Sequence, residues 1–344
     1  MMRRPLGRYI LAGMMAGGLL LTACQSAPSP PAGNTATPST RSPAPPRISA
    51  AARLYPGAFP RFLNFSSDGM LWITLNDNSI ARLDPAGNLT TYKIRESNTS
   101  PGDIVEGPDG AMWFSGFQEV GRVDATGTIT LSRAYTVGLP GALAAGPGGE
   151  LWFTNETVPP QISRFSPSGT MDSTEIPSGQ GGLDMAGITQ GPDGAMWFTQ
   201  SPVGLDDPPD AIGRVTAQGR YTSWPLPKSG SVPHRITAGP DGTLWFTERS
   251  GHRIGRITTK GAISEYRLPV SENPFDIVPG RDGAVWFTTD TSVGRITRAG
   301  DIKLWPVPGA KSLIGMAAAQ DGSFWLADGK GDAVWHFVPP LTPS

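Results

Sequence analysis

A short pattern of turn and apolar residues recurs along the chain from about residue 55 onward. Each copy has a Gly-containing turn, two further residues and a tryptophan, as in DGTLW. The tryptophans of the seven copies are Trp72, Trp113, Trp152, Trp197, Trp245, Trp286 and Trp325. Consecutive tryptophans are 39 to 48 residues apart, which is close to the repeat length of a four-stranded propeller blade. The pattern therefore predicts seven blades.

A second signature follows each tryptophan and a third follows most of them, and together they indicate four strands to a blade, named A to D from the inside. The segment IGRI at 254–257 is typical of strand C, and ISEYRLP at 263–269 is typical of strand D. The Asp-Gly pair before the tryptophan suits a two-residue hairpin turn between strands A and B. Because side chains alternate along a strand, Trp245 is expected to pack on one neighbouring blade, and Leu244 and Phe246 on the other.

Only six outer strands follow the strand C motifs, since the last motif is followed by VPPLTPS alone. The segment ISAAARLYP at 48–56 has a similar apolar ending into proline, so it is expected to supply the seventh. Such pairing closes the ring and removes open sheet edges. The predicted fold is therefore all-β, a seven-bladed β-propeller of four-stranded antiparallel blades over residues 48–344, with the N-terminal strand closing the last blade.

Composition agrees with short strands and many turns, because the 344 residues include 44 Gly and 35 Pro with 38% hydrophobic residues. The formal net charge of −1 offers no basic field for nucleic acid, so no nucleic-acid partner is expected. The single cysteine, Cys24, excludes a disulfide within the chain.

The N-terminal segment has the features of an export signal. A basic stretch, MMRRPLGR, precedes an apolar run of about fifteen residues, which is short for a membrane span. The run ends in Leu21-Thr22-Ala23-Cys24, which resembles the bacterial lipobox. We expect residues 1–23 to be a lipoprotein signal peptide, Cys24 to be lipidated, and residues 24–47 to be a disordered Pro/Ser/Thr tether. The protein would then be exported and lipid-anchored to the cell membrane or outer membrane, facing outside the cytoplasm.

Candidate site residues follow from propeller geometry, because the D-to-A and B-to-C loops of all blades meet at one end of the ring, here called the mouth. Unlike the repeated motifs, polar residues at these positions differ between blades. The ligand-binding candidates are Arg61, Asp103, Glu156, Asp184, Arg235 and Asp276. A small-molecule or peptide ligand is the expected partner. For each residue taken alone, a solvated surface side chain remains the alternative.

His234 is one of three histidines and lies where the mouth begins, so it is a candidate general acid or base. Blade four has a long connection after strand B with three carboxylates, Asp206, Asp207 and Asp210. These carboxylates suit either a proline-rich rim loop or a calcium site, although no EF-hand spacing is present.

The repeats GPDGxxWFTE, IGRI and IxEYxLP resemble those of the streptogramin B lyases, also called virginiamycin B lyases, over about residues 55–338. The resemblance implies a seven-bladed propeller that opens the ester of a cyclic depsipeptide antibiotic by elimination with Mg²⁺. In that chemistry a base removes the proton next to the ester carbonyl while the metal stabilises the enolate charge.

Family members with this activity carry Pro-His in two successive blades, and only Pro233-His234 matches here. The next blade has Phe275 after Pro274, and Asn273 at the acidic position. Counted by blade order, the last blade also offers no histidine. The resemblance assigns catalytic roles to His234, Asp290 and Glu248, and Mg²⁺ ligation to Glu248 and Asp276.

Three functions remain open at this point. Because the second Pro-His pair is missing, a membrane-anchored propeller that binds a ligand or partner at its mouth is favoured. The alternatives are an active Mg²⁺-dependent lyase that uses His234, and a lactone hydrolase.

Overall fold

A computed structural model of the chain describes residues 45–95, 100–132, 140–166, 170–178, 182–203 and 209–340. Contacts divide the chain into Met1–Ser42 and Pro43–Ser344, and only the second unit is described below. The expected signal peptide, Cys24 and nearly all of the expected tether lie outside the described residues. Within the described ranges, no helix has the length and apolar character needed to cross a membrane.

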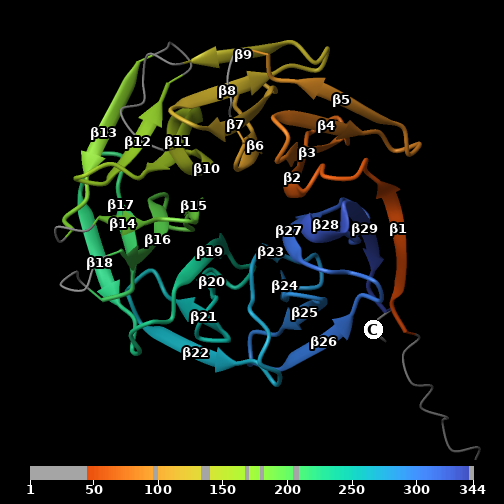
Figure 1. Cartoon of the computed structure of the whole chain (residues 1–344). Helices are drawn as coiled ribbons and strands as arrows, with labels where there is room; N and C mark the ends of the chain where they lie inside the picture. Colours follow the sequence, from red (N-terminus) through yellow and green to blue (C-terminus); the bar gives the residue numbers. More distant parts are fainter. Residues whose placement is uncertain are drawn as a thin grey trace, which may run out of the picture. The chain divides into compact units, whose positions relative to one another are not determined.

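The described unit is a ring of seven antiparallel sheets around a central axis (Figure 1). In each complete blade the strands run from the inside outward in chain order. Blades one to three are formed by β2 (Pro60–Phe65), β3 (Leu71–Leu75), β4 (Ser79–Leu83) and β5 (Leu89–Lys93); β6 (Ile104–Glu106), β7 (Met112–Gly116), β8 (Glu119–Val123) and β9 (Ile129–Ser132); and β10 (Pro140–Gly146), β11 (Glu150–Asn155), β12 (Gln161–Phe165) and β13 (Met171–Glu175), with a 3-10 turn η1 (Pro147–Gly149) between β10 and β11.

The remaining four blades follow the same plan, except that strand A of blade four is split into two short strands that both pair with strand B. Blades four to seven are formed by β14 (Leu183–Asp184), β15 (Ile188–Gln190), β16 (Met196–Pro202), β17 (Ala211–Val215) and β18 (Tyr221–Pro225); β19 (Pro233–Ala238), β20 (Leu244–Glu248), β21 (Arg253–Ile257) and β22 (Ile263–Arg267); β23 (Ile277–Pro279), β24 (Val285–Thr288), β25 (Ser292–Ile296) and β26 (Ile302–Pro306); and β27 (Leu313–Ala318), β28 (Phe324–Asp328), β29 (Ala333–Val338) and β1 (Arg47–Arg53), with a 3-10 turn η2 (Gly329–Gly331) before β29.

The first strand closes the ring, as the sequence predicts. β1 lies antiparallel to β29, from Arg47 opposite Val338 to Arg53 opposite Ala333 (Figure 1). Ile48 packs on the core that blade seven shares with blade six, and Ala52 packs on the core that blade seven shares with blade one. The last blade is therefore built from both ends of the propeller sequence.

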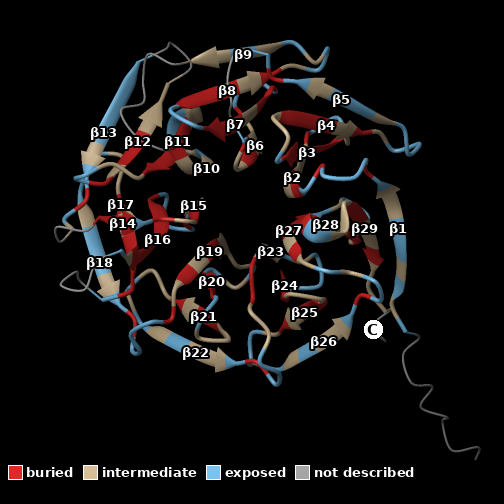
Figure 2. Cartoon of the chain, in the orientation of Figure 1, coloured by how far each residue is buried: buried red, intermediate tan, exposed pale blue. Residues whose placement is uncertain are grey.

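The core lies between blades, with the middle strands mostly buried and the outer strands mostly exposed (Figure 2). Trp245 packs with Ile277 and Phe287 of blade six. Leu244 and Phe246 pack in a separate cluster with residues of blade four. The predicted alternation of strand B between its two neighbours is thus confirmed.

The repeated polar residues serve the blades themselves. In blade five, Asp241 accepts a hydrogen bond from the Trp245 indole at 3.2 Å and pairs with Arg256 at 2.8 Å. The Arg256 guanidinium lies 5.4 Å from the Trp245 ring centre. Gly255 has no room for a side chain, because a Cβ there would overlap the Phe246 ring. The Asp, Trp, Arg and Gly of the repeat are therefore structural.

Candidate functional site

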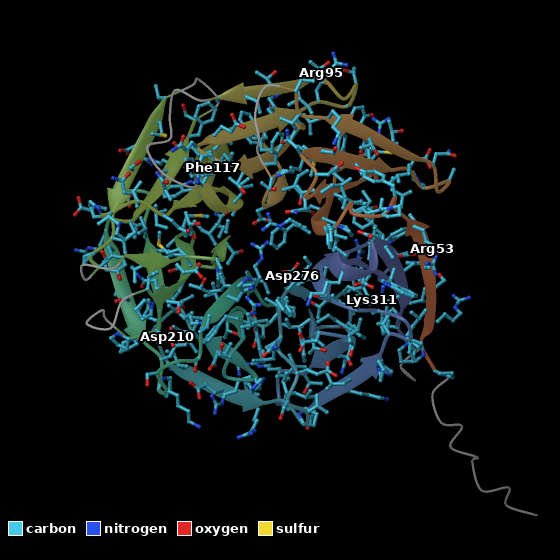
Figure 3. The ribbon with its side chains drawn as sticks, viewed as in Figure 1. Arg53, Arg95, Phe117, Asp210, Asp276 and Lys311 are labelled. Carbon is cyan, nitrogen blue, oxygen red and sulfur yellow. The ribbon has the colours of Figure 1, made fainter. Side chains whose placement is uncertain are left out.

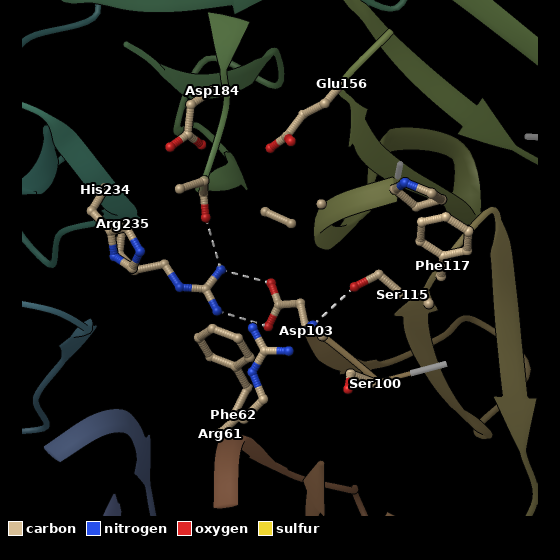
Figure 4. A pocket seen from close by; sticks show the side chains of 16 residues that line it. Arg61, Phe62, Ser100, Asp103, Ser115, Phe117, Glu156, Asp184, His234 and Arg235 are labelled. Carbon is tan, nitrogen blue, oxygen red and sulfur yellow. Dashed lines mark hydrogen bonds and ion pairs between the residues drawn. The ribbon is translucent and has the colours of Figure 1, made fainter. Parts of the chain in front are cut away.

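A cavity of about 490 Å³ lies at the mouth, and its walls come from blades one to five (Figure 4). Six of the residues that the sequence predicts at the mouth line it: Arg61, Asp103, Glu156, Asp184, His234 and Arg235. Glu248, Asp276 and Asp290 are not among the lining residues.

A hydrogen bond from a backbone N–H to a hydroxyl of strand B positions the inner residues in most blades. The N–H of Arg235 donates to the Thr247 hydroxyl at 3.0 Å, and the N–H of Asp103 donates to the Ser115 hydroxyl at 2.9 Å. The same bond recurs at equivalent positions of other blades, namely Phe62, Ala142, Gly187 and Asp276. A strand B hydroxyl thus fixes the backbone in six blades, while the side chain at the position differs between blades.

Arg235 reaches across the cavity to Asp103 (Figure 4). Its guanidinium donates to both carboxylate oxygens of Asp103, at 2.8 and 3.1 Å, and to the Ala186 carbonyl at 3.2 Å. It lies 4.1 Å from the Phe62 ring centre, and its Nε is 3.9 Å from Asp276. Burial by itself would lower the pKa of Arg235, but Asp103 and Asp276 raise it above the ordinary value. One side chain of blade five thereby contacts blades one, two, four and six.

The carboxylates of Asp103 and Asp276 also accept hydrogen bonds from the backbone of other blades. Asp103 accepts the Leu143 N–H of blade three at 3.1 Å. Asp276, near the ring centre in Figure 3, accepts the Met316 N–H of blade seven at 2.8 Å. Burial raises the pKa of Asp276 although Arg235 opposes the shift. Of the predicted ligand-binding residues, Asp276 therefore acts within the ring and not in the cavity.

Arg61 presents a positive charge to the cavity from blade one. Within the described ranges its guanidinium has no hydrogen-bond or ion-pair partner, and both oxygens of nearby Asp103 are engaged by Arg235. Burial lowers the pKa of Arg61, and the charge of Arg235 lowers it further, while Asp103 opposes both. Arg61 is thus a cation beside a carboxylate, Asp103, that is already paired with Arg235.

Glu156 and Asp184 form an acidic wall opposite Arg61 (Figure 4). Burial raises the pKa of Glu156 to about 7, with a further contribution from the charge of Asp184. Desolvation also raises the pKa of Asp184 and the charge of Arg249 opposes the shift, although Asp184 is an exposed residue. Neither carboxylate has an ion-pair partner in the part of the chain that the structure describes.

His234 is held as a neutral imidazole. Its Nδ1 lies 3.2 Å from the Phe275 carbonyl oxygen, and because a carbonyl only accepts, Nδ1 carries the proton in this contact. Burial lowers the pKa of His234 to about 4, and the charge of Arg235 contributes. The Phe275 ring stands edge-on to the imidazole at 6.1 Å, and Arg249 lies 4.6 Å from the same ring centre.

The structure does not bring the other two proposed catalytic residues to the cavity. Glu248 is fully buried at the end of β20, with its carboxylate 3.9 Å from Arg253, and burial raises its pKa to about 7. Asp290 accepts hydrogen bonds from the backbone and side-chain amides of Asn273, at 2.9 and 3.3 Å. Only His234 of the predicted catalytic trio therefore lines the cavity.

The residues offered as Mg²⁺ ligands do not fit that role here. Glu248 faces Arg253 and Asp276 faces Arg235, so each carboxylate already has a cation of the protein beside it. In the described part of the chain, no group of three or more His, Cys, Asp or Glu side chains is arranged to hold a metal ion.

In the long connection of blade four, Asp206 and Asp207 lie outside the described residues. Asp210 is buried, and its carboxylate accepts the Ser201 hydroxyl at 2.8 Å and the Ser231 N–H at 2.7 Å. Asp210 therefore joins the end of this connection to blade five, and its oxygens are used within the protein.

Sequence reasoning missed Phe117, which lines the cavity and is 60% exposed, and Arg249, which stands over Phe275. A simple signal would have found both, because each is the fourth residue after its blade's tryptophan, as Glu156 is. Glu248 is the third residue after Trp245 and points into the blade. The count is not uniform around the ring, because Ser201, the fourth residue after Trp197, is buried.

Seven blades, a charged mouth and a central ion pair define a propeller with one differentiated end, suited to binding or transforming a small ligand. The virginiamycin B lyase family model matches residues 48–136 and 134–337. The chain therefore belongs to the virginiamycin B lyase family.

Curated relatives cover parts of this match. A virginiamycin B lyase of Nocardia farcinica is 30% identical over 175 residues, which are 51% of this chain and 58% of that protein. One of Saccharopolyspora erythraea is 45% identical over 98 residues, which are 28% of this chain and 30% of that protein. Both alignments span less than two thirds of the relatives' length.

Solved structures are similar over most of the ring. A streptogramin B lyase structure has a TM-score of 0.77 and 29% identity, covering 85% of this chain and 97% of that one. A catalytically inactive virginiamycin B lyase from Staphylococcus aureus with quinupristin, in which a histidine is replaced by alanine, has a TM-score of 0.76 and 28% identity, covering 85% and 99%.

Proposed function

We propose that this chain is a binding member of its family, which recognises a small molecule or short peptide at the mouth without opening a cyclic depsipeptide. The observation that carries the proposal is Phe275. It stands where the second Pro-His pair of the family pattern would place a histidine, and its ring is edge-on to His234 and lies under Arg249.

The remaining imidazole is poorly suited to the reaction. A general base works best when its pKa is near the working pH, whereas the pKa of His234 is lowered to about 4. Neither Glu248 nor Asp290 lines the cavity to replace a second base. Loss of a general base costs about 10²-fold to 10⁴-fold in rate. A site without its base can therefore still bind a ligand although it no longer catalyses the reaction at a useful rate.

One observation favours the active lyase as a second candidate. Glu156 lines the cavity with a pKa raised to about 7, which suits a general base at neutral pH. The lactone hydrolase gains no comparable support, because no Asn or Gln is among the cavity-lining residues of the described ranges.

Incubation with quinupristin or virginiamycin S and Mg²⁺ tests the proposal. Elimination leaves the mass unchanged and alters the chromatographic retention, whereas hydrolysis adds one water to the mass. We expect no product above the protein-free control, with an active family member as the positive control. A linear product that is lost in His234→Ala or Glu156→Gln would establish the lyase and overturn the proposal.

We also propose that the protein is exported and lipid-anchored through Cys24, on the strength of the lipobox-like Leu21-Thr22-Ala23-Cys24. Metabolic labelling with an alkyne fatty acid in a bacterial host should label the chain and not Cys24→Ser. Equal labelling of both, or of neither, would contradict the anchor.

A further inference from the structure

We infer that the mouth takes a zwitterion, with the ligand's ammonium group between Glu156 and Asp184 and its carboxylate at Arg61. The inference rests on the proposed binding function and names the class of ligand: a free amino acid or a short peptide with unblocked ends.

The cavity separates charge of opposite sign. The acidic wall is formed by Glu156 of blade three and Asp184 of blade four, and Arg61 reaches in from blade one (Figure 4). Between them, Arg235 and Asp103 neutralise each other through two hydrogen bonds of 2.8 and 3.1 Å. The charges left for a ligand are therefore negative on one side and positive on the other.

The acidic wall forms no ion pair with a described residue, although the charge of Arg249 acts on Asp184. Glu156 accepts one backbone hydrogen bond, from Met185, and neither carboxylate forms an ion pair with a described residue. The charge of Asp184 disfavours the charged form of Glu156, and a cation between the two carboxylates relieves that repulsion. An ammonium group supplies both the charge and three hydrogen-bond donors.

Arg61 is the matching site for an anion. Its planar guanidinium suits a carboxylate, which it can bind through two parallel hydrogen bonds. The positive charge of Arg235 disfavours the charged form of Arg61, so an incoming carboxylate would offset a repulsion that the folded protein already contains.

The remaining lining suits a small polar ligand. The volume of about 490 Å³ is within the range of about 300–1,000 Å³ typical of small-molecule sites. Ser100 and the neutral His234 line the cavity from different sides, and the exposed ring of Phe117 also lines it (Figure 4). These groups are able to contact the uncharged middle of an amino acid or peptide.

The test uses native mass spectrometry of the whole protein with an equimolar mixture of free amino acids, dipeptides and tripeptides. The same mixture is presented with free ends, N-acetylated, C-amidated, and blocked at both ends. We expect retention of components with free ends, and at least about tenfold weaker retention when either end is blocked.

Variants test which cavity residues bind the ligand's ammonium group and which residue binds its carboxylate. In Glu156→Gln/Asp184→Asn, acetylation of the ligand should no longer matter, while amidation still does. In Arg61→Met, amidation should no longer matter, while acetylation still does. The matched controls Glu175→Gln and Arg281→Met change exposed residues outside the cavity and should behave like the unchanged protein.

Equal retention of all four ligand forms would overturn the zwitterion and leave binding at the mouth intact. Retention that falls to the same extent for every form in the charge variants would also overturn it. If none of the four ligand forms is retained, the inference is overturned as well. The depsipeptide experiment then tests the proposed function independently. Displacement of bound peptides by Mg²⁺ alone would assign the acidic wall to a metal and contradict the inference.

Discussion

Adjacent residues at the end of a strand B can have very different surroundings, as blade five shows. Glu248 and Arg249 are adjacent in sequence, yet Glu248 is fully buried in the blade and Arg249 stands over Phe275 at the mouth. Alternation along a strand explains the difference. The buried carboxylate of Glu248 therefore affects folding stability, whereas the unpaired charges of the cavity are available to a ligand.

The buried carboxyl of Glu248 should make folding stability depend on pH. Its pKa is raised from 4.5 to about 7 by burial, with Ser231, Glu265, Arg253 and Asp210 as its neighbours. The folded state therefore binds the proton more tightly, and this stabilisation is present below pH 4.5 and lost as the pH rises through about 7. A shift of this size corresponds to about 3 kcal/mol.

Replacing Glu248 with Gln removes the titration and nearly keeps the shape. Relative to the unchanged protein, the free energy of unfolding of Glu248→Gln should gain up to about 3 kcal/mol between pH 4 and pH 8. Urea unfolding at both pH values measures it, with the exposed Glu175→Gln as control. A difference that does not change with pH would show that Glu248 ionises as it does in the unfolded chain.

At the scale of elements, the sequence predicts strands because the repeat fixes their residues. The Asp-Gly turn, the buried tryptophan and the glycine under Phe246 recur, so number, order and closure of the blades follow from the sequence. The site does not repeat, and its contacts join distant residues: Asp103 and Arg235 come from different blades, and His234 meets a backbone carbonyl of Phe275. Periodicity contains no information about such pairs.

The closing strand offers a test of the ring. A chain that begins at residue 54 lacks β1, so β29 becomes an open edge and the cores near Ile48 and Ala52 lose their cover. Compared with a chain that begins at residue 45, Tm should fall by on the order of 10 °C, since each kcal/mol is about 2–4 °C in a large domain.

Circular dichroism measures the melting of both chains, and size-exclusion chromatography reports the association expected of an unpaired edge. Equal melting temperatures, with both chains monomeric, would show that β1 pairing adds no stability.

At the scale of the whole molecule, the blades are joined at the centre as well as around the ring. Arg235 contacts residues of four other blades, and its ion pair with Asp103 is largely withdrawn from solvent. A buried ion pair adds little net stability, but removal of one partner leaves the other charge buried and uncompensated.

Arg235→Met should therefore destabilise the propeller by about 3–5 kcal/mol. The double variant Arg235→Met/Asp103→Asn should recover part of that loss, because the uncompensated carboxylate is gone. Urea unfolding measures both, and the exposed Arg281→Met should change the free energy of unfolding by no more than about 0.5 kcal/mol. If Arg235→Met matched that control, the central ion pair would have no part in holding the ring together.

The strand B hydroxyls that anchor the inner backbone also affect how this lineage diversifies. At Phe62 and Ala142 the anchor holds the main chain whatever residue stands there, so a substitution changes the chemistry of the centre and leaves the scaffold in place. At Asp103, Arg235 and Asp276 a substitution would also break ion pairs and hydrogen bonds between blades. Gly187 is the exception, because a Cβ would come within 2.6 Å of the His234 carbonyl. Specificity can thus change at least cost to the fold at the anchored positions outside the central ion pairs, and not at Gly187.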